Sequence, residues 1–102
     1  MNNNHNDLKN KKAVALQYRM DYAAPKVVAT GAGHMAQKII DTAKDADVRL
    51  HYNPALVNEL AKVDVGADIP PELYEIVAQI LVFIDDLDRL EEIRRNGGAS
   101  ND

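Results

Sequence analysis

A short β-branched segment that ends in two closely spaced glycines and opens into an amphipathic helix constrains this fold more than any other feature of the chain. Lys26–Thr30 has the apolar, β-branched composition of a strand. Gly31-Ala32-Gly33 follows as a turn, and the next segment repeats its apolar residues at the spacing of one helix face. These apolar residues are Met35, Ala36, Ile39, Ile40 and Ala43. The pattern predicts an α/β domain in which a helix packs onto a small sheet.

Two further strands are expected on either side of this unit. Residues 13–18 form a short apolar run, and residues 48–52 alternate between two faces. The segments 26–30, 33–46 and 48–52 fit a right-handed parallel crossover. The expected order of elements is β-β-α-β-α-α, with a small mixed β-sheet of about three strands packed with about three helices.

The last two helices are expected from the residues at their ends. Asn53 supplies a capping oxygen, and Pro54 fits the first helical position because no hydrogen bond is needed from its nitrogen. The longest helix is expected after Ile69-Pro70-Pro71, with a broad apolar face that continues to Leu87. Gly97-Gly98 is expected to end this helix.

The far part of this long helix is strongly charged. Asp85–Arg89 and Glu91–Arg95 are favourable i,i+4 pairs, but each contributes only ~0.2–0.5 kcal/mol, so the apolar face must hold the helix. The crowded carboxylates are interpreted as a solvated face rather than a metal cluster. They are Asp85, Asp86, Asp88, Glu91 and Glu92.

The length of 102 residues leaves room for one domain with one core. Residues 1–12 are polar and rich in asparagine, and we expect them to form a flexible N-terminal arm. Residues 13–95 are expected to fold, and residues 96–102 to form a disordered tail. One phenylalanine and four tyrosines are the only aromatic residues, so the core is expected to be aliphatic.

Composition argues against several classes of function. The formal net charge is −4 and no basic stripe with interleaved aromatics occurs, so nucleic acid is not an expected partner. The absence of cysteine removes disulfides, thiolate nucleophiles and cysteine-ligated metals. No apolar run approaches the roughly 20 residues that span a bilayer, and no secretory signal is recognisable, so we expect a cytoplasmic protein without membrane insertion.

The glycine turn is the strongest indication of an enzyme. Gly31, Gly33 and Ala36 match G-x-G-x-x-A between a strand and a helix, where a dinucleotide-binding fingerprint lies. Such a site needs an acidic residue about 20 positions further on, whereas the third expected strand ends in Tyr52-Asn53. A tight structural turn is the favoured interpretation, and a small nucleotide-binding enzyme is the third and weakest hypothesis.

No other set of residues predicts catalysis or metal binding. His5, His34 and His51 lack metal-ligand spacing, and Ser100, in the expected tail, is the only serine. Asn53-Pro54 could cleave itself by attack of the asparagine side chain on its own carbonyl carbon, but helix capping is the favoured interpretation. We therefore expect no enzymatic activity, no catalytic residue, no metal and no cofactor.

Six short motifs cover roughly residues 13–90 in a characteristic order. They are Ala13-Val-Ala-Leu16, Ala24-Pro-Lys-Val-Val-Ala29, Gly31-Ala-Gly33, Ile69-Pro70, Glu72-Leu-Tyr74 and Val77-Ala78. In this order the motifs resemble the C-terminal cytoplasmic domain of the FlhB/YscU (EscU/HrcU) family of flagellar and type III secretion switch proteins. The resemblance implies the fold of that domain and a role in protein export.

Family members carry a membrane domain, a linker and this cytoplasmic domain, in which an Asn-Pro-Thr-His loop cleaves itself. The cleavage accompanies the switch from early, rod and hook type, to late, filament type, export substrates. The loop precedes the strand that matches residues 13–18, where this chain has Asn10-Lys11-Lys12. The resemblance thus implies a short stand-alone homologue without autocleavage and without the preceding strand. An edge left unpaired there invites strand addition from another chain, unless Lys9, Lys11 and Lys12 protect it.

The resemblance also implies a small apolar surface that docks export substrates. Its positions fall on Ala24 and Pro25, before the second strand, and on Ala78 and Leu81, in the long helix. Ala78 and Leu81 are spaced i,i+3 and share a helix face, although a purely structural role would place Leu81 in the core. Thr30 stands where relatives often carry lysine.

Two hypotheses follow for the partners. In the first, the chain is a component of the export apparatus that binds export substrates or export-gate proteins in the cytoplasm, at the membrane-bound export gate. In the second, it is a regulatory partner that completes or competes with the cytoplasmic domain of full-length FlhB without binding substrates. A homo-oligomer or edge-strand pairing is compatible with both.

Overall fold

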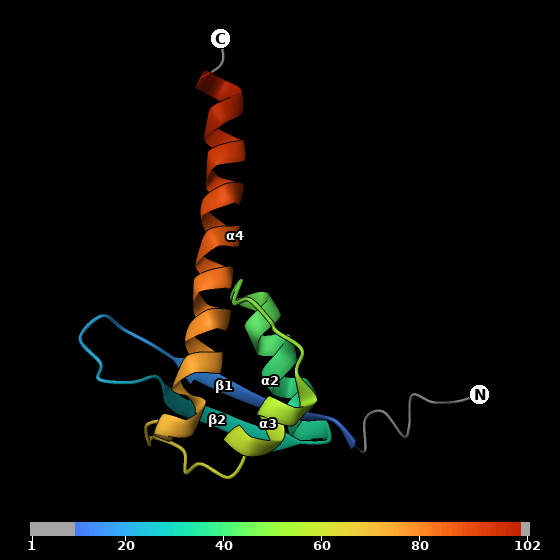
Figure 1. The fold of residues 1–102 in the computed structure, drawn as a ribbon. Helices are drawn as coiled ribbons and strands as arrows, with labels where there is room; N and C mark the ends of the chain where they lie inside the picture. The colour runs from blue at the N-terminus through green and yellow to red at the C-terminus, as the bar shows by residue number, and fades with distance from the viewer. Residues whose placement is uncertain (1–9, 101–102) are drawn as a thin grey trace. The chain divides into compact units, whose positions relative to one another are not determined.

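Contacts along the chain divide it into two units, Met1–Pro71 and Glu72–Asp102. The structure is a computed structural model that describes residues 10–100, with side chains to residue 95 (Figure 1). Residues 1–9 of the expected N-terminal arm and residues 101–102 of the expected tail lie outside the described residues.

The sheet of the first unit forms because two apolar extended segments are joined by a short connector. β1 (Lys12–Gln17) and β2 (Lys26–Ala32) pair as a two-stranded antiparallel sheet. The register shifts between Ala15 and Leu16, where Val28 of β2 is an extra residue with an exposed side chain. Both of these predicted strands are confirmed.

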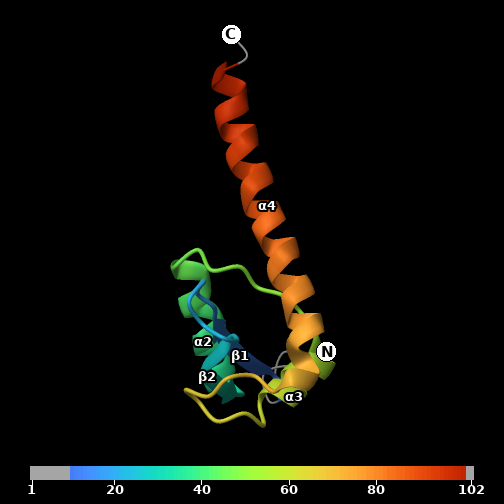
Figure 2. The ribbon, with the colours of Figure 1, turned by 60° about the vertical axis from the view of Figure 1, so that its left-hand side comes forward.

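The helix α2 (His34–Asp45) begins where the glycine turn predicts a helix. Gly33 precedes it with φ 61° and ψ −126°, and its N–H donates to the carbonyl oxygen of Lys11 at 2.8 Å. A Cβ atom on Gly31 would lie 2.9 Å from the Cβ atom of Met35, so the missing side chain lets the strand and the helix approach closely. As Figures 1 and 2 show, α2 lies against both strands.

The third predicted strand, at residues 48–52, does not form. The outer edge of β2 pairs instead with residues 66–69: Gly66 N–H donates to the carbonyl oxygen of Val27 at 2.6 Å, and Val27 N–H donates to that of Ala67 at 3.0 Å. Alternation indicates an extended segment, but a strand also needs a neighbour with free backbone groups. The third strand and the parallel crossover are therefore wrong, and the observed order is β-β-α-α-α.

The helix α3 (Pro54–Leu60) starts as predicted. The side-chain oxygen of Asn53 accepts a hydrogen bond from Leu56 N–H at 3.1 Å, which confirms the capping interpretation. α3 lies against β1 and buries Leu56 and Leu60. The buried residues of the first unit are aliphatic, as predicted: Ala13, Ala24, Val27, Ala36, Leu56, Leu60 and Ile69.

A short 3₁₀ turn, Pro71–Leu73, leads into α4 (Tyr74–Ser100), which confirms the predicted long helix. α4 continues through Gly97 and Gly98, so the helix end predicted at these glycines is wrong. Glycine weakens a helix, but it ends one only where another interaction favours the turn. The predicted α/β fold class, with a small sheet and about three helices, is confirmed, although the sheet has two antiparallel strands rather than about three mixed ones. No helix in the described part of the chain is both long and apolar enough to cross a membrane.

Candidate functional site

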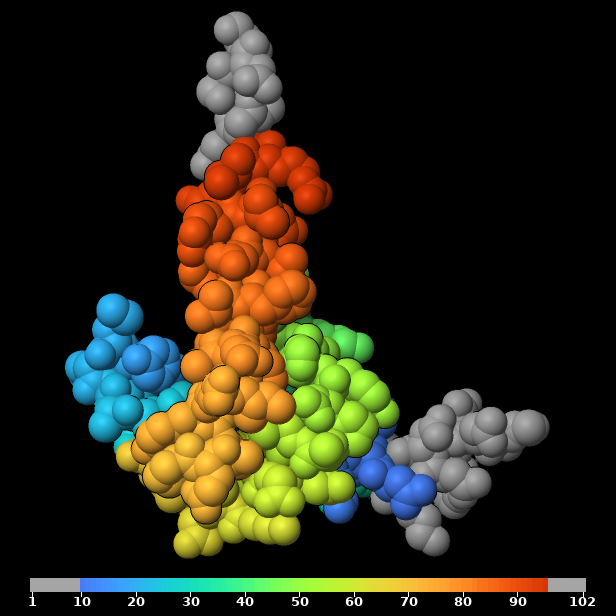
Figure 3. Space-filling model, viewed as in Figure 1, coloured from blue at the N-terminus to red at the C-terminus, as the bar shows by residue number. Residues whose placement is uncertain are grey.

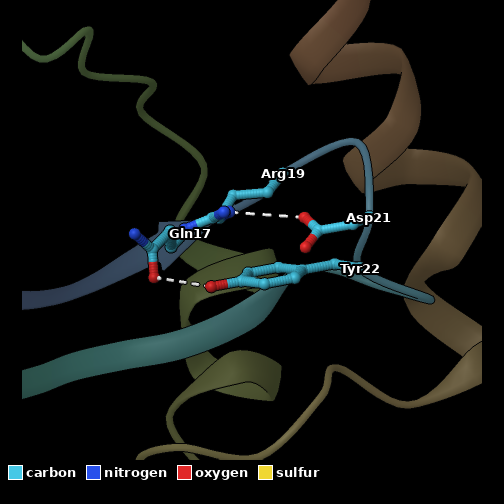
Figure 4. A network of polar contacts seen from close by, with 4 residues as sticks. All are labelled: Gln17, Arg19, Asp21 and Tyr22. Atoms are coloured by element: carbon cyan, nitrogen blue, oxygen red, sulfur yellow. Dashed lines mark hydrogen bonds and ion pairs between the residues drawn. The ribbon is translucent and has the colours of Figure 1, made fainter.

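The connector between β1 and β2 leads to the first pair of predicted docking residues, and its own contacts hold it in place. Tyr22 N–H donates to the carbonyl oxygen of Arg19 at 2.9 Å, which closes a turn. Arg19 Nε donates to Asp21 Oδ1 and the Tyr22 hydroxyl donates to Gln17 Oε1, each at 3.3 Å (Figure 4). Met20, within this turn, is 93% exposed. The connector forms a separate protrusion on the surface (Figure 3).

Lys26 joins this connector to a distant part of the chain. Its Nζ atom lies 2.6 Å from Asp68 Oδ1 and 5.3 Å from the centre of the Tyr22 ring, and the Arg19 guanidinium lies 5.6 Å from the same ring centre. The hydrogen bond to Asp68 raises the pKa of Lys26 above its ordinary value of 10.5, so the amine stays charged at neutral pH. Lys26 and Asp68 are 42 positions apart, so no sequence spacing indicated this contact.

Ala24 and Pro25 lie together at the start of β2. Ala24 is only 2% exposed, whereas Pro25 is half-buried. The carbonyl oxygen of Pro25 accepts a hydrogen bond from Ile69 N–H at 2.9 Å. The backbone at Pro25 is therefore held by the same segment that pairs with β2.

The second pair of predicted docking residues lies on α4. Ala78 is exposed and Leu81 is partly buried, and their spacing places them on one helix face. Ala24 and Pro25 belong to the first unit, whereas Ala78 and Leu81 belong to the second. The docking role of these four residues stays a prediction.

The glycine turn has a geometry that favours the structural interpretation. A phosphate-binding turn presents its backbone N–H groups to the ligand, but the N–H of Gly33 is already bonded to the carbonyl of Lys11. The strand before the turn pairs antiparallel, whereas a dinucleotide-binding fold is built on a parallel sheet. Within residues 10–95 no three His, Asp or Glu side chains are placed to hold a metal ion.

The outer edge of β1 carries backbone groups that do not bond to β2. Gly33 N–H bonds to the carbonyl oxygen of Lys11, so the carbonyl group of Lys11 points towards the side of β2. Backbone N–H and C=O groups alternate in direction along an antiparallel strand, so those of Lys12, Val14 and Leu16 point away from β2. In the described residues β2 is the sole strand partner of β1.

Two lysines near this edge bond to side chains of neighbouring helices. Lys11 Nζ donates to Gln37 Oε1 at 2.8 Å, and Lys12 Nζ donates to Asn58 Oδ1 at 3.1 Å. These side chains therefore bond to the helices α2 and α3, while Lys9 lies outside the described residues.

Comparisons with known proteins extend the structural findings. Residues 10–84 match the model of a family described as the FlhB HrpN YscU SpaS family. Protein YlqH of Bacillus subtilis (strain 168) is 46% identical over 79 residues, which cover 76% of this chain and 85% of that protein. Flagellar biosynthetic protein FlhB of Aquifex aeolicus (strain VF5) is 38% identical over 74 residues, which cover 71% of this chain but 21% of FlhB.

A solved structure agrees with these matches. The cytoplasmic domain of FlhB from Shewanella putrefaciens has a TM-score of 0.75 and 25% sequence identity, covering 86% of this chain and 80% of that chain. The chain thus spans about a fifth of the length of the FlhB relatives and most of the length of YlqH. Since the family model covers well over half of the sequence, this chain belongs to the FlhB HrpN YscU SpaS family.

Proposed function

We propose that this chain is a non-enzymatic component of a flagellar or type III protein export apparatus that binds export substrates weakly through a surface centred on Pro25. Family membership supports the link to export, because its relatives include flagellar biosynthetic protein FlhB and hypersensitivity response secretion protein HrcU. On this proposal the chain acts in the cytoplasm, at the membrane-bound export gate. The observation that carries the docking role is that Pro25 is half-buried and that its carbonyl oxygen is held by Ile69 N–H.

Pre-organisation explains why such a small surface would bind a peptide. Proline fixes its own φ angle, and the bond from Ile69 N–H holds its carbonyl, so little backbone entropy is lost when a partner arrives. The side chain of Ala24 is buried beneath, so it supports the surface rather than touching a partner. Lys26 and Asp68 place a fixed ion pair beside the proline.

On α4, Ala78 and the exposed part of Leu81 would form a second apolar contact. Contacts made by so few apolar residues support only weak binding, which suits a module that must release each substrate. No reactive group is needed for this role.

Introducing a carboxylate at either of these two contacts should weaken substrate binding while the fold survives. Pro25→Asp and Ala78→Asp are each expected to lower affinity on the order of tenfold, because a charge would have to be desolvated against an apolar partner. Fluorescence anisotropy with purified rod-, hook- and filament-type export substrates measures the affinity, and circular dichroism checks the fold.

Exposed positions nearby provide the matched controls for these two changes. Gln79→Asp lies on α4 beside Ala78, and Thr30→Asp lies in β2, and both side chains are exposed. These controls should bind like the unmodified chain. Equal binding by Pro25→Asp and Ala78→Asp, or no substrate binding by the unmodified chain, would contradict the proposed docking surface.

The outer edge of β1, which has no strand beside it within residues 10–100, favours a second candidate function. In this alternative the chain completes or competes with the cytoplasmic domain of a full-length FlhB protein by adding a strand beside Lys12, Val14 and Leu16. The main-chain bonds of such a pair need no matching side chains, so affinity would depend on the backbone N–H groups of this edge.

Removing one outward N–H group separates this candidate from substrate docking. Val14→Pro takes away an N–H that faces away from β2 and should reduce co-purification with the FlhB cytoplasmic domain to background, while Val14→Thr keeps the N–H and should bind normally. Thermal melting confirms that each variant folds. Unchanged recovery of Val14→Pro would exclude strand addition at this edge.

A further inference from the structure

One face of the far half of α4 exposes a run of apolar side chains. Phe83 is 55% exposed, and Leu90 and Ile93 are each 57% exposed. At 3.6 residues per turn, these three residues and Leu87 fall within about 120° of arc, which is one side of the helix. A shallow hollow on this side is lined by Asp86, Arg89, Leu90 and Ile93. An exposed apolar face bordered by charges is typical of a site of protein association.

Two opposite charges lie on this face at equal distances along the helix from Leu90. Asp86 precedes Leu90 by four residues and Arg94 follows it by four, so each lies about 6 Å from Leu90 along the axis. The Arg89 guanidinium lies 2.5 Å from the Asp85 carboxylate, which confirms this predicted pair. The same guanidinium lies 3.5 Å from the Asp86 carboxylate. The Asp86 side chain is 56% exposed and remains accessible to a second cation.

We propose that two copies of this chain associate through this face, with their α4 helices antiparallel and Leu90 of each copy at the centre. In a two-fold contact, residue i of one copy meets residue j of the other, and j meets i. With Leu90 on the axis, Leu87 lies level with Ile93 of the second copy, and Asp86 lies level with Arg94 of the second copy. Both pairs match because their members are equally spaced about residue 90.

This self-complementarity selects the second copy as occupant and the antiparallel direction as its orientation. A parallel pair would place Asp86 beside Asp86 and Arg94 beside Arg94, and like charges at a contact oppose association. The antiparallel pair instead brings apolar side chains together at three levels and closes two ion pairs across the seam. Leu90 forms the central level, and Leu87 with Ile93 forms one level on each side.

Exchanging the two charges tests the orientation. Asp86→Arg alone and Arg94→Asp alone should each weaken the dimer on the order of tenfold, because each puts like charges in two symmetric contacts. The double variant Asp86→Arg/Arg94→Asp should recover the affinity of the unmodified chain. Sedimentation velocity of the full chain over a concentration series measures the association, and circular dichroism checks that α4 stays helical.

Changes away from the face serve as matched controls. Glu92→Arg and Arg95→Asp make the same charge reversals on the opposite side of α4 and should leave the association unchanged. Leu90→Asp should abolish it, because two carboxylates would meet at the centre. A chain that sediments as a monomer at every concentration overturns the proposal, even if another helical protein binds at Leu90. So does a dimer that survives Leu90→Asp, or a double variant no stronger than the single ones.

Discussion

Replacing Ile69 by alanine should lower the free energy of unfolding by about 2–5 kcal/mol, the largest single effect that we expect in this chain. The Ile69 side chain is 1% exposed and is among the largest fully buried side chains. The change removes buried methyl and methylene groups and leaves a cavity that the surroundings fill only in part. Unfolding by urea with linear extrapolation measures the effect.

A control lies in the same connecting segment. Val65 is 58% exposed, so Val65→Ala should change the free energy of unfolding by less than about 0.5 kcal/mol. An Ile69→Ala variant that loses less than about 1 kcal/mol would mean that the segment 66–69 is not packed in this way. The pairing of this segment with the edge of β2 would then also be in doubt.

Replacing Gly33 by alanine should lower the free energy of unfolding by about 1–3 kcal/mol. The backbone of Gly33 has φ 61° and ψ −126°, a region that residues with a Cβ atom reach only under strain. The N–H of Gly33 is bonded to the carbonyl of Lys11, so the turn cannot relax without losing that bond. Urea unfolding measures this change as well.

Two further substitutions serve as comparisons for the stability of Gly33→Ala. Gly33→Asn should be as destabilising as Gly33→Ala, because asparagine tolerates the left-handed helical region but not ψ near −126°. Thr30→Ala, at an exposed position of β2, should change stability by less than about 0.5 kcal/mol. If Gly33→Ala were as stable as the unmodified chain, the turn would not be held in this conformation, and the structural interpretation of the two glycines would lose its main support.

The Ile69 prediction also bears on the proposed docking surface. Ile69 N–H holds the carbonyl of Pro25, so a loosened Ile69 should weaken substrate binding indirectly, together with a loss of stability. Pro25→Asp should weaken binding without a comparable loss of stability. The two variants therefore separate a contact with the substrate from the support of that contact.

Only part of the candidate site could be predicted from the sequence. The motif order pointed to Ala24, Pro25, Ala78 and Leu81, but it did not indicate that Ala24 is buried and Pro25 partly exposed. It also did not indicate the contact between Lys26 and Asp68, because a hydrogen bond between side chains 42 positions apart leaves no periodic signal.

The sequence by itself determined the elements whose causes are local. The glycine turn before α2, the Asn53 cap of α3 and the apolar periodicity of α4 each depend on residues a few positions apart, and each led to the correct helix. Interactions within one or two turns are encoded directly in the spacing of side chains.

Only the tertiary structure decided which extended segments meet. Residues 48–52 alternate like a strand but do not form one, whereas residues 66–69 contain a glycine and pair with β2. A strand is completed by the backbone groups of a neighbour, and backbone groups are the same in every non-proline residue. Side-chain pattern therefore specifies that a segment can be extended, while the packing of Val27 and Ile69 in the core selects its partner.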